Sequence, residues 1–137
     1  MRKILKTKWL YAFMILGVLS FVMSSCSNDD NEESSSGKAR FEVKGNFSGK
    51  LLIVYSFSTT NVGESDSNEV STLPWSKEFN YQGQVAMGGA ANSILKGKPG
   101  ESIELNLILD GQVKATAKAT ADANGELSTP TITHTQY

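Results

Sequence analysis

The sequence predicts an all-β fold for the part of the chain that follows residue 38. From Ala39 onward the apolar residues recur with a period of two, and no stretch carries the i, i+3, i+4, i+7 spacing of an amphipathic helix without Gly or Pro breaks. Residues typical of strands recur between clusters of Gly, Asn, Asp and Ser, which favour turns. About seven such segments, joined by short connections, indicate an antiparallel β-sandwich of immunoglobulin-like type, with a small barrel as the alternative.

The first two predicted strands cover residues 40–45 and 50–58, with a turn at 46–49. The first strand places Phe41 and Val43 on one face. The second strand is apolar on both faces at its start, which is typical of a central strand. Its inward row is predicted to be Leu51, Ile53, Tyr55 and Phe57.

The middle of the domain gives weaker signals. Residues 59–68 are polar and are predicted to form the longest loop, followed by a short strand at 69–72. Residues 76–82 alternate and form the next predicted strand, with Phe79 and Tyr81 facing inward.

Glycine and proline mark the two least regular segments. Residues 84–90 predict a weak, glycine-rich strand that is bulged or close to another backbone, and 92–100 a connector. After a turn at 122–125, residues 127–135 predict a last strand, which Pro130 interrupts. Proline cannot donate to a ladder, so we expect this strand at a sheet edge.

The best-defined element is a hairpin over residues 101–120, which turns at Asp110 and Gly111. Its inward rows are predicted to be Ile103, Leu105, Leu107 and Leu109 on one strand, and Val113, Ala115 and Ala117 on the other.

The register of this hairpin depends on the length of its loop. A two-residue loop would place the charge of Lys114 opposite Leu107 in the core row. A three-residue loop, Leu109 to Gly111, pairs Leu107 with Val113 and puts Gly111 in the left-handed position of a bulge. We therefore predict the three-residue loop, which also pairs Leu105 with Ala115.

The N-terminal residues 1–25 are typical of a secretory signal. Four basic residues precede an apolar run of 14 residues, Trp9 to Val22. A bilayer core of about 30 Å needs about 20 apolar residues in a helix, so this run favours a cleaved signal helix over a retained membrane span.

Directly after the predicted signal comes Cys26, which is the one cysteine in the sequence. The stretch Met23-Ser24-Ser25-Cys26 resembles a bacterial lipobox, with Met where Leu is usual, and implies diacylglyceryl attachment to the Cys26 thiol. The sequence thus predicts a lipoprotein signal at 1–25, a lipid anchor at Cys26 and no disulfide bond.

Residues 26–38 are predicted to form an acidic disordered tether, and residues 39–137 the sandwich. The stretch from Ser27 to Gly37 has no apolar residue and cannot form a core. Serine after the modified cysteine, followed by acids, resembles lipoproteins of the Bacteroidetes group, in which such clusters direct export to the surface. We expect an outer-membrane protein, exposed at the cell surface or facing the periplasm.

Charge argues against nucleic acid as a partner. Four of the 13 bases lie in residues 1–25, which leaves nine bases against 14 acids from Cys26 onward. Nucleic acid requires a basic face, and the exported part of the chain is acidic.

The sequence offers little that could support catalysis, and we expect no enzyme activity, no cofactor and no metal. His134 is the single histidine and reads as an edge-strand residue. The oxygen donors from Glu64 to Glu69 could bind calcium, but they lack the spacing of an EF-hand and read more simply as a mobile loop. The glycine-rich Met87–Ala90 does not match a phosphate loop. Trp75 is expected to pack at the core or its rim.

Residues from Phe41 to Lys118 resemble the soluble domain of the mycobacterial small membrane proteins, the MmpS family. The matching segments are Glu42–Gly45, Leu73–Ser76 and Leu109–Ala115. The resemblance implies an immunoglobulin-like sandwich outside the membrane and an accessory role beside large lipid and siderophore exporters. The sequence departs from the family in having a lipid anchor instead of a membrane helix, and no cysteine in the domain.

These observations favour an interaction module, anchored to the membrane through Cys26, that contacts another protein of the envelope. The alternatives are an accessory or ligand carrier for an envelope transporter and a surface glycan-binding domain of adhesin type. An exposed aromatic row would favour glycan binding, and a closed pocket between the sheets would favour a carrier.

Overall fold

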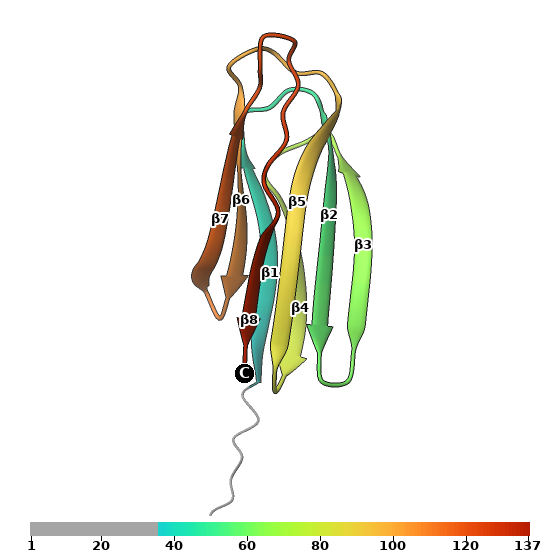
Figure 1. Cartoon of the computed structure of the whole chain (residues 1–137), viewed down its shortest axis with the longest axis vertical. Helices are drawn as coiled ribbons and strands as arrows, with labels where there is room; N and C mark the ends of the chain where they lie inside the picture. Colours follow the sequence, from blue (N-terminus) through green and yellow to red (C-terminus); the bar gives the residue numbers. More distant parts are fainter. Residues whose placement is uncertain (1–35) are drawn as a thin grey trace, which may run out of the picture. The chain divides into compact units, whose positions relative to one another are not determined.

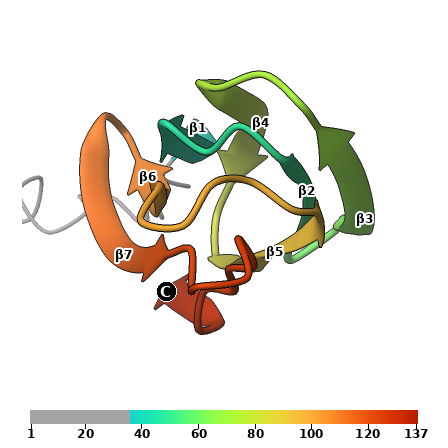
Figure 2. The ribbon, with the colours of Figure 1, turned by 90° about the horizontal axis from the view of Figure 1, so that it is seen from above.

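A computed structural model describes residues 36–137, which form two four-stranded antiparallel sheets packed face to face (Figures 1 and 2). The first sheet has the order β4-β1-β6-β7 and the second β3-β2-β5-β8. The eight strands are β1 (Ser36–Gly45), β2 (Lys50–Thr59), β3 (Gly63–Val70), β4 (Trp75–Gln82), β5 (Val85–Leu95), β6 (Ser102–Leu109), β7 (Gln112–Thr120) and β8 (Ile132–Gln136).

The predicted all-β antiparallel sandwich is confirmed, with eight strands in the described residues in place of about seven. The predicted signal at 1–25, the lipid-bearing Cys26 and most of the predicted tether lie outside residues 36–137.

The core lies between the central strands of the two sheets. The predicted inward row of β2 is confirmed, since all four of its side chains are buried. On β1, Phe41 and Val43 are fully buried, and the Phe41 ring lies 5.1 Å from the Tyr55 ring of the opposite sheet, measured between centroids. Aromatic pairs of this kind stabilise beyond the area they bury.

Strand β1 is longer than predicted. It begins at Ser36 instead of residue 40, so it includes the last three residues of the predicted tether. Both of its edges are paired: Ser36 to Val43 lie opposite β4, and Ala39 to Gly45 lie opposite β6. Ala39 is fully buried between these neighbours, so the domain begins as a central strand.

The predicted polar loop at 59–68 is wrong, because β3 occupies most of it. Strand β3 forms a hairpin with β2, in which Ser58 lies opposite Gly63 and Leu51 opposite Val70. Its side chains are almost all exposed, and Val70 alone is buried. An edge strand that is exposed on both faces does not need alternating apolar residues, so the sequence pattern does not reveal it. Backbone pairing with β2 holds β3 in place.

Strand β5 also extends beyond its prediction, to Leu95, so the connector is confined to residues 96–101. Its glycines lie close to their neighbours, as predicted: a Cβ at Gly89 would lie 3.3 Å from the carbonyl oxygen of Val54 and 3.5 Å from the Phe41 ring. The irregularity in its pairing with β2 falls at Lys50 and Leu51, outside the predicted range.

The predicted three-residue loop of the β6–β7 hairpin is wrong. The loop is Asp110-Gly111, with φ of 50° and 79°, the combination typical of a type I′ turn. Leu109 lies opposite Gln112, and a bulge then places Leu107 opposite Ala115. Lys114 is the extra residue of this bulge, so its charge never opposes the core row.

Because of the bulge, one side chain that was predicted to face inward faces outward. Val113 lies opposite Ile108 and is 56% exposed, whereas Ala117, beyond the bulge, is buried as predicted. A single inserted residue changes which side chains point inward, and the sequence pattern alone does not reveal it.

The outer face of the first sheet carries a polar network. Glu104 accepts a hydrogen bond from Asn106 (3.0 Å) and forms ion pairs with Lys44 (3.3 Å) and Lys118 (3.2 Å). The hydrogen bond from Asn106, together with the two lysines, lowers the pKa of Glu104 to about 2. Asn106 also accepts from the Thr116 hydroxyl (2.7 Å), so this buried amide is satisfied.

The last strand lies at a sheet edge, as predicted. Strand β8 pairs with β5 at the end of the second sheet, and Pro130 precedes it. His134 lies opposite Met87 on this edge strand, which confirms its expected place.

The hairpin register gives a direct test of the fold. We expect Leu107→Ala to lower the free energy of unfolding by about 2–5 kcal/mol, because Leu107 is fully buried and its truncation leaves a cavity. We expect Val113→Ala to change it by no more than about 0.5 kcal/mol, because that side chain is half exposed. Denaturant unfolding measures both values, and a Val113→Ala loss as large as that of Leu107→Ala would contradict the bulge.

Candidate interaction surface at the loop end

The two ends of the sandwich differ in how they connect their strands. One end, here called the loop end, holds the connections at 46–49, 71–74, 96–101 and 121–131. The other, here called the turn end, holds only the short turns at 60–62, 83–84 and 110–111, and β1 begins there. In Figure 1 the long connections lie together at the top and the tight turns at the bottom.

Glu101 fastens two connections of the loop end together. One oxygen of its carboxylate accepts hydrogen bonds from the Ser48 amide (2.8 Å), the Ser48 hydroxyl (2.8 Å) and the Lys98 amide (2.9 Å). The bond from Lys98 and those from Ser48 hold the pKa of Glu101 below its ordinary value. The hydrogen bonds of this side chain therefore link the connections at 46–49 and 96–101.

Glycine packing joins a third connection to these two. A Cβ at Gly125, whose φ is +78°, would lie 2.2 Å from the carbonyl oxygen of Gly97, and the Gly97 amide donates to the Gly125 carbonyl (2.9 Å). Gly97 lies against the buried Phe47 ring, with 2.5 Å between its ideal Cβ position and Cε2. Only glycine permits backbones to approach so closely.

The long connection at 121–131 is strapped along β5. The Thr129 amide donates to the Ala91 carbonyl (2.9 Å), and the Thr129 hydroxyl accepts from the Ala91 amide (2.9 Å). The Leu127 carbonyl accepts from the Ser93 amide (2.9 Å), and Leu127 is buried. At its start Asp122 accepts from the amides of Asn124 (2.8 Å) and Glu126 (3.0 Å), which closes the predicted turn.

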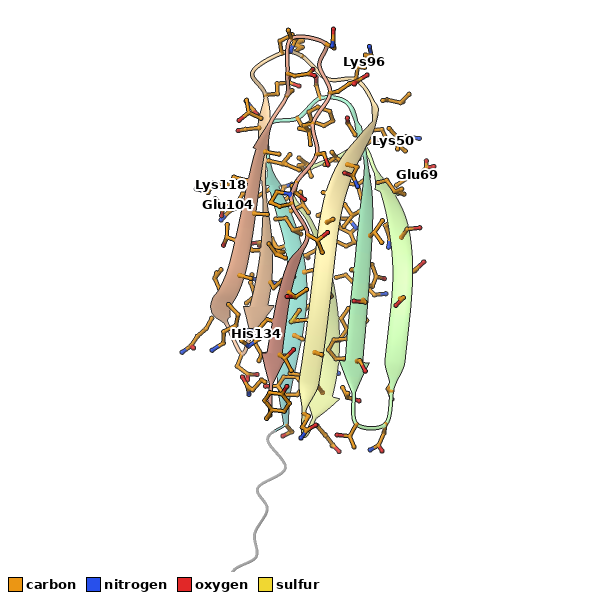
Figure 3. All side chains as sticks on the ribbon, viewed as in Figure 1. Lys50, Glu69, Lys96, Glu104, Lys118 and His134 are labelled. Carbon is orange, nitrogen blue, oxygen red and sulfur yellow. The ribbon has the colours of Figure 1, made fainter. Side chains whose placement is uncertain are left out.

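Exposed side chains of mixed chemistry lie beside these fixed connections. Leu95 and Ile94, at the end of β5, are 59% and 43% exposed. Lys96 pairs with Glu126 across two connections (3.4 Å), and Figure 3 shows Lys96 at the top of the molecule. We call this set the loop-end patch: Ile94, Leu95, Lys96, Lys98 and Glu126.

A second candidate feature is a cleft at the turn end, of about 620 Å³. The rings of Phe57 and Phe79, one from each sheet, stack in its wall with their centroids 4.5 Å apart. Its rim is polar and exposed and includes Asn61 and Glu64, so the cleft opens to solvent. It is therefore an open notch between the sheets and not a closed pocket.

Asp110 fixes the point at which the chain joins the sandwich. Its carboxylate accepts from the Lys38 amide (2.8 Å) and from the Tyr81 hydroxyl (2.5 Å), and its own amide donates to the Lys38 carbonyl (2.8 Å). The bonds from Tyr81 and Lys38 lower the pKa of Asp110, while burial and the bond to Asp110 raise the pKa of Tyr81 to about 12. A Cβ at Gly37 would lie 2.0 Å from the Asp110 carboxylate, so a larger residue there would have to displace this carboxylate from its bonds to Lys38 and Tyr81.

The residues singled out from the sequence are spread over the fold. Glu64–Glu69 lie on strand β3 instead of a loop, and because successive side chains of a strand point to opposite faces, they do not converge. Within residues 36–137 no group of three acidic, His or Cys side chains could hold a metal ion. Trp75 is partly buried against residues of the core, as predicted, with its ring centroid 6.2 Å from that of Tyr55.

The loop-end fastenings were not predicted. In the sequence Glu101 is an ordinary acid at the start of a hairpin, and only the fold brings it to Ser48, 53 residues earlier. The glycines at 97 and 125 carried a weak signal, since glycine beside charged residues marks turns, but their contact with each other is tertiary.

No family model and no curated protein matches the sequence. Among residues 36–137, no helix is long and apolar enough to cross a membrane.

The hydrogen bonds that Glu101 accepts from Ser48 and Lys98 can be tested by amide exchange. We expect Glu101→Gln to accelerate hydrogen exchange at the Ser48 and Lys98 amides, because a neutral amide oxygen accepts more weakly than a carboxylate. The same amides should lose protection in the unsubstituted protein as the pH falls through the lowered pKa of Glu101, since a carboxylate with a depressed pKa stabilises the fold above its ordinary pKa.

Glu126→Gln is the matched control. Its side chain pairs only with exposed Lys96 at the same end, so it should leave both amides unchanged. Equal exchange rates in Glu101→Gln and the unsubstituted protein would contradict the link that Glu101 makes between the two connections.

Proposed function

We propose that the protein is a lipid-anchored interaction module of the cell envelope, which presents its loop end to another envelope protein. The observation that carries this proposal is the opposition of the two ends. The chain joins the sandwich at Ser36, at the turn end, whereas the fixed connections and the loop-end patch lie at the other end. A domain held through residues before Ser36 would display its loops away from the anchor.

The anchor rests on the sequence. A basic start, an apolar run of 14 residues and Cys26 directly after small residues support signal cleavage and acylation at Cys26. Several acyl chains on one residue hold a protein firmly in a bilayer, whereas one chain alone holds it marginally. The acids that follow support export to the outer membrane and display at the cell surface.

The loop end has the physical properties of a protein-binding surface. Its connections are held by Glu101, by the contact of Gly97 with Gly125 and by the strap along β5, so little conformational freedom remains to be lost on binding. The exposed Leu95 supplies an apolar side chain, and the neighbouring Lys96 with its partner Glu126 supplies charges of both signs. Such a surface fits a protein partner with an apolar spot and mixed charges better than a polyanion.

The immunoglobulin-like assignment is part of the proposal and has support in the topology. Strand β1 pairs with β4 in one sheet, and β2 pairs with β5 and with β3 in the other. The pairs β1–β4 and β2–β5 join strands that are not consecutive in the chain, as the Greek-key connections of immunoglobulin-type sandwiches do. Such a sandwich is also what the resemblance to the MmpS family implies, and that resemblance favours an accessory role beside an exporter.

A second candidate function is the carriage of a small ligand, and the cleft at the turn end favours it. Its volume falls within the range of ligand sites, and Phe57 and Phe79 offer aromatic surface. A small molecule that co-purifies with the protein from its own envelope would support this function. The glycan alternative would need an exposed aromatic row, and among the described residues Tyr137 is the one aromatic side chain classed as exposed.

The anchor is tested by one substitution. We expect Cys26→Ala to release the exported protein from the membrane fraction, because the substitution removes the only thiol that could carry lipid. Partition between detergent and water phases measures the change. Retention of Cys26→Ala in the membrane to the same extent as the unsubstituted protein would contradict lipid anchoring.

The loop end is tested by photocrosslinking in intact cells. A photoreactive residue in place of Leu95 should crosslink one discrete envelope protein, because Leu95 is the most exposed apolar residue of the loop-end patch. The matched control replaces Val113, which is equally apolar and similarly exposed but lies at the turn end. Crosslinks to the same protein from both positions, or from Val113 alone, would contradict recognition through the loop end.

A further inference from the structure

The turn end is built from three short turns, whereas longer connections form the loop end. Its three turns, at 60–62, 83–84 and 110–111, contain one charged residue, Asp110, whose carboxylate is already bonded to Lys38 and Tyr81. The connections of the loop end contain five: Lys96, Lys98, Glu101, Asp122 and Glu126.

Exposed apolar side chains lie at the turn end. Val62, in the β2–β3 turn, is 57% exposed, and Tyr137, which follows β8, is 91% exposed. Val113, beside the β6–β7 turn, is 56% exposed. In Figure 1 the β2–β3 turn, the β4–β5 turn and the end of β8 lie together at the bottom, and the β6–β7 turn ends slightly higher. Val62 and Tyr137 therefore lie at the same end of the sandwich.

The chain also leaves the sandwich at this end, in a fixed position. Asp110 holds Lys38 through both its carboxylate and its amide, so the direction of β1 is set up to its first residues. Ten peptide units separate Cys26 from Ser36, and a fully extended chain of that length spans at most about 35 Å. A lipid on Cys26 would hold the turn end within that distance of the bilayer.

We propose that the turn end rests on the bilayer surface, with Val62 and Tyr137 in the headgroup region. This inference rests on the proposed lipid anchor at Cys26 and adds an orientation to it. Tyrosine favours the membrane–water interface because its ring is apolar and its hydroxyl remains hydrated. Among the charged residues at this end, Asp110 is already bonded to Tyr81, Glu64 on β3 is exposed, and Lys114, beside Val113, can approach anionic headgroups.

A weak contact is sufficient when the protein is already tethered. The short tether makes the contact intramolecular in effect, so the local concentration of lipid surface is high and a contact too weak to bind free protein can still be occupied. The sandwich would then stand upright, with the loop-end patch at the greatest distance from the membrane that the domain permits.

Depth-dependent quenching tests this orientation in the full lipid-modified protein. The protein is purified from its own membranes and reconstituted in phosphatidylcholine vesicles, with or without bromine on the acyl chains. We expect Val62→Trp to lose roughly half of its added fluorescence in brominated vesicles. Leu95→Trp is the matched control, since its side chain is equally exposed at the opposite end, and it should lose none. The native Trp75 packs between the sheets and gives a constant background.

Tyr137→Trp provides a second probe that replaces one aromatic residue with another at a site outside the strands, so it does not depend on tolerance of the β2–β3 turn. Quenching of Val62→Trp or Tyr137→Trp above Leu95→Trp supports the proposal. Equal quenching at both ends, or quenching of Leu95→Trp alone, overturns it while leaving the anchor intact. Failure of the protein to float with the vesicles overturns the anchor and the orientation together.

Discussion

The contact between Phe41 and Tyr55 is the interaction on which the rest of the structure depends. These residues lie on the central strands β1 and β2, one in each sheet, and both are buried. Within residues 36–137 no cysteine is present, so this core must hold the two sheets together without a disulfide bond. Because Phe41 belongs to the first strand, the same contact ties the point where the chain joins the domain to the centre of the fold.

This tie gives the molecule two chemically distinct ends. Strand β1 carries the chain from the turn end, where it begins, to the loop end, and neighbours on both sides hold it along its length. The bonds of Asp110 fix one end of β1, and at the other end the Asn46 amide donates to the Ser102 carbonyl (3.0 Å) while the Asn46 side chain accepts from the Ser102 amide (2.8 Å). This strand therefore runs between the two ends of the domain, to which we assign the proposed attachment and the proposed recognition separately.

Sequence patterns predicted the strands whose inner faces are apolar and failed where alternation is absent or interrupted. The rows on β2 and β6 were readable because burial of one face imposes a period of two. Strand β3 was missed because both of its faces meet water, and the bulge at Lys114 was missed because one extra residue changes the register without changing composition. At the loop end the sequence located glycines and a turn, but the role of Glu101 depends on residues far apart in the chain, which only the fold brings together.

The central claim is that a lipid at Cys26 holds one end of a rigid sandwich while the other end remains free to bind. The most direct measurement is the intact mass of the protein extracted from its native membrane. The account predicts loss of residues 1–25 and a mass increase, located at Cys26, equal to a diacylglyceryl group with or without a further acyl chain. A protein that retains residues 1–25, or that begins at Cys26 with an unmodified thiol, would contradict it.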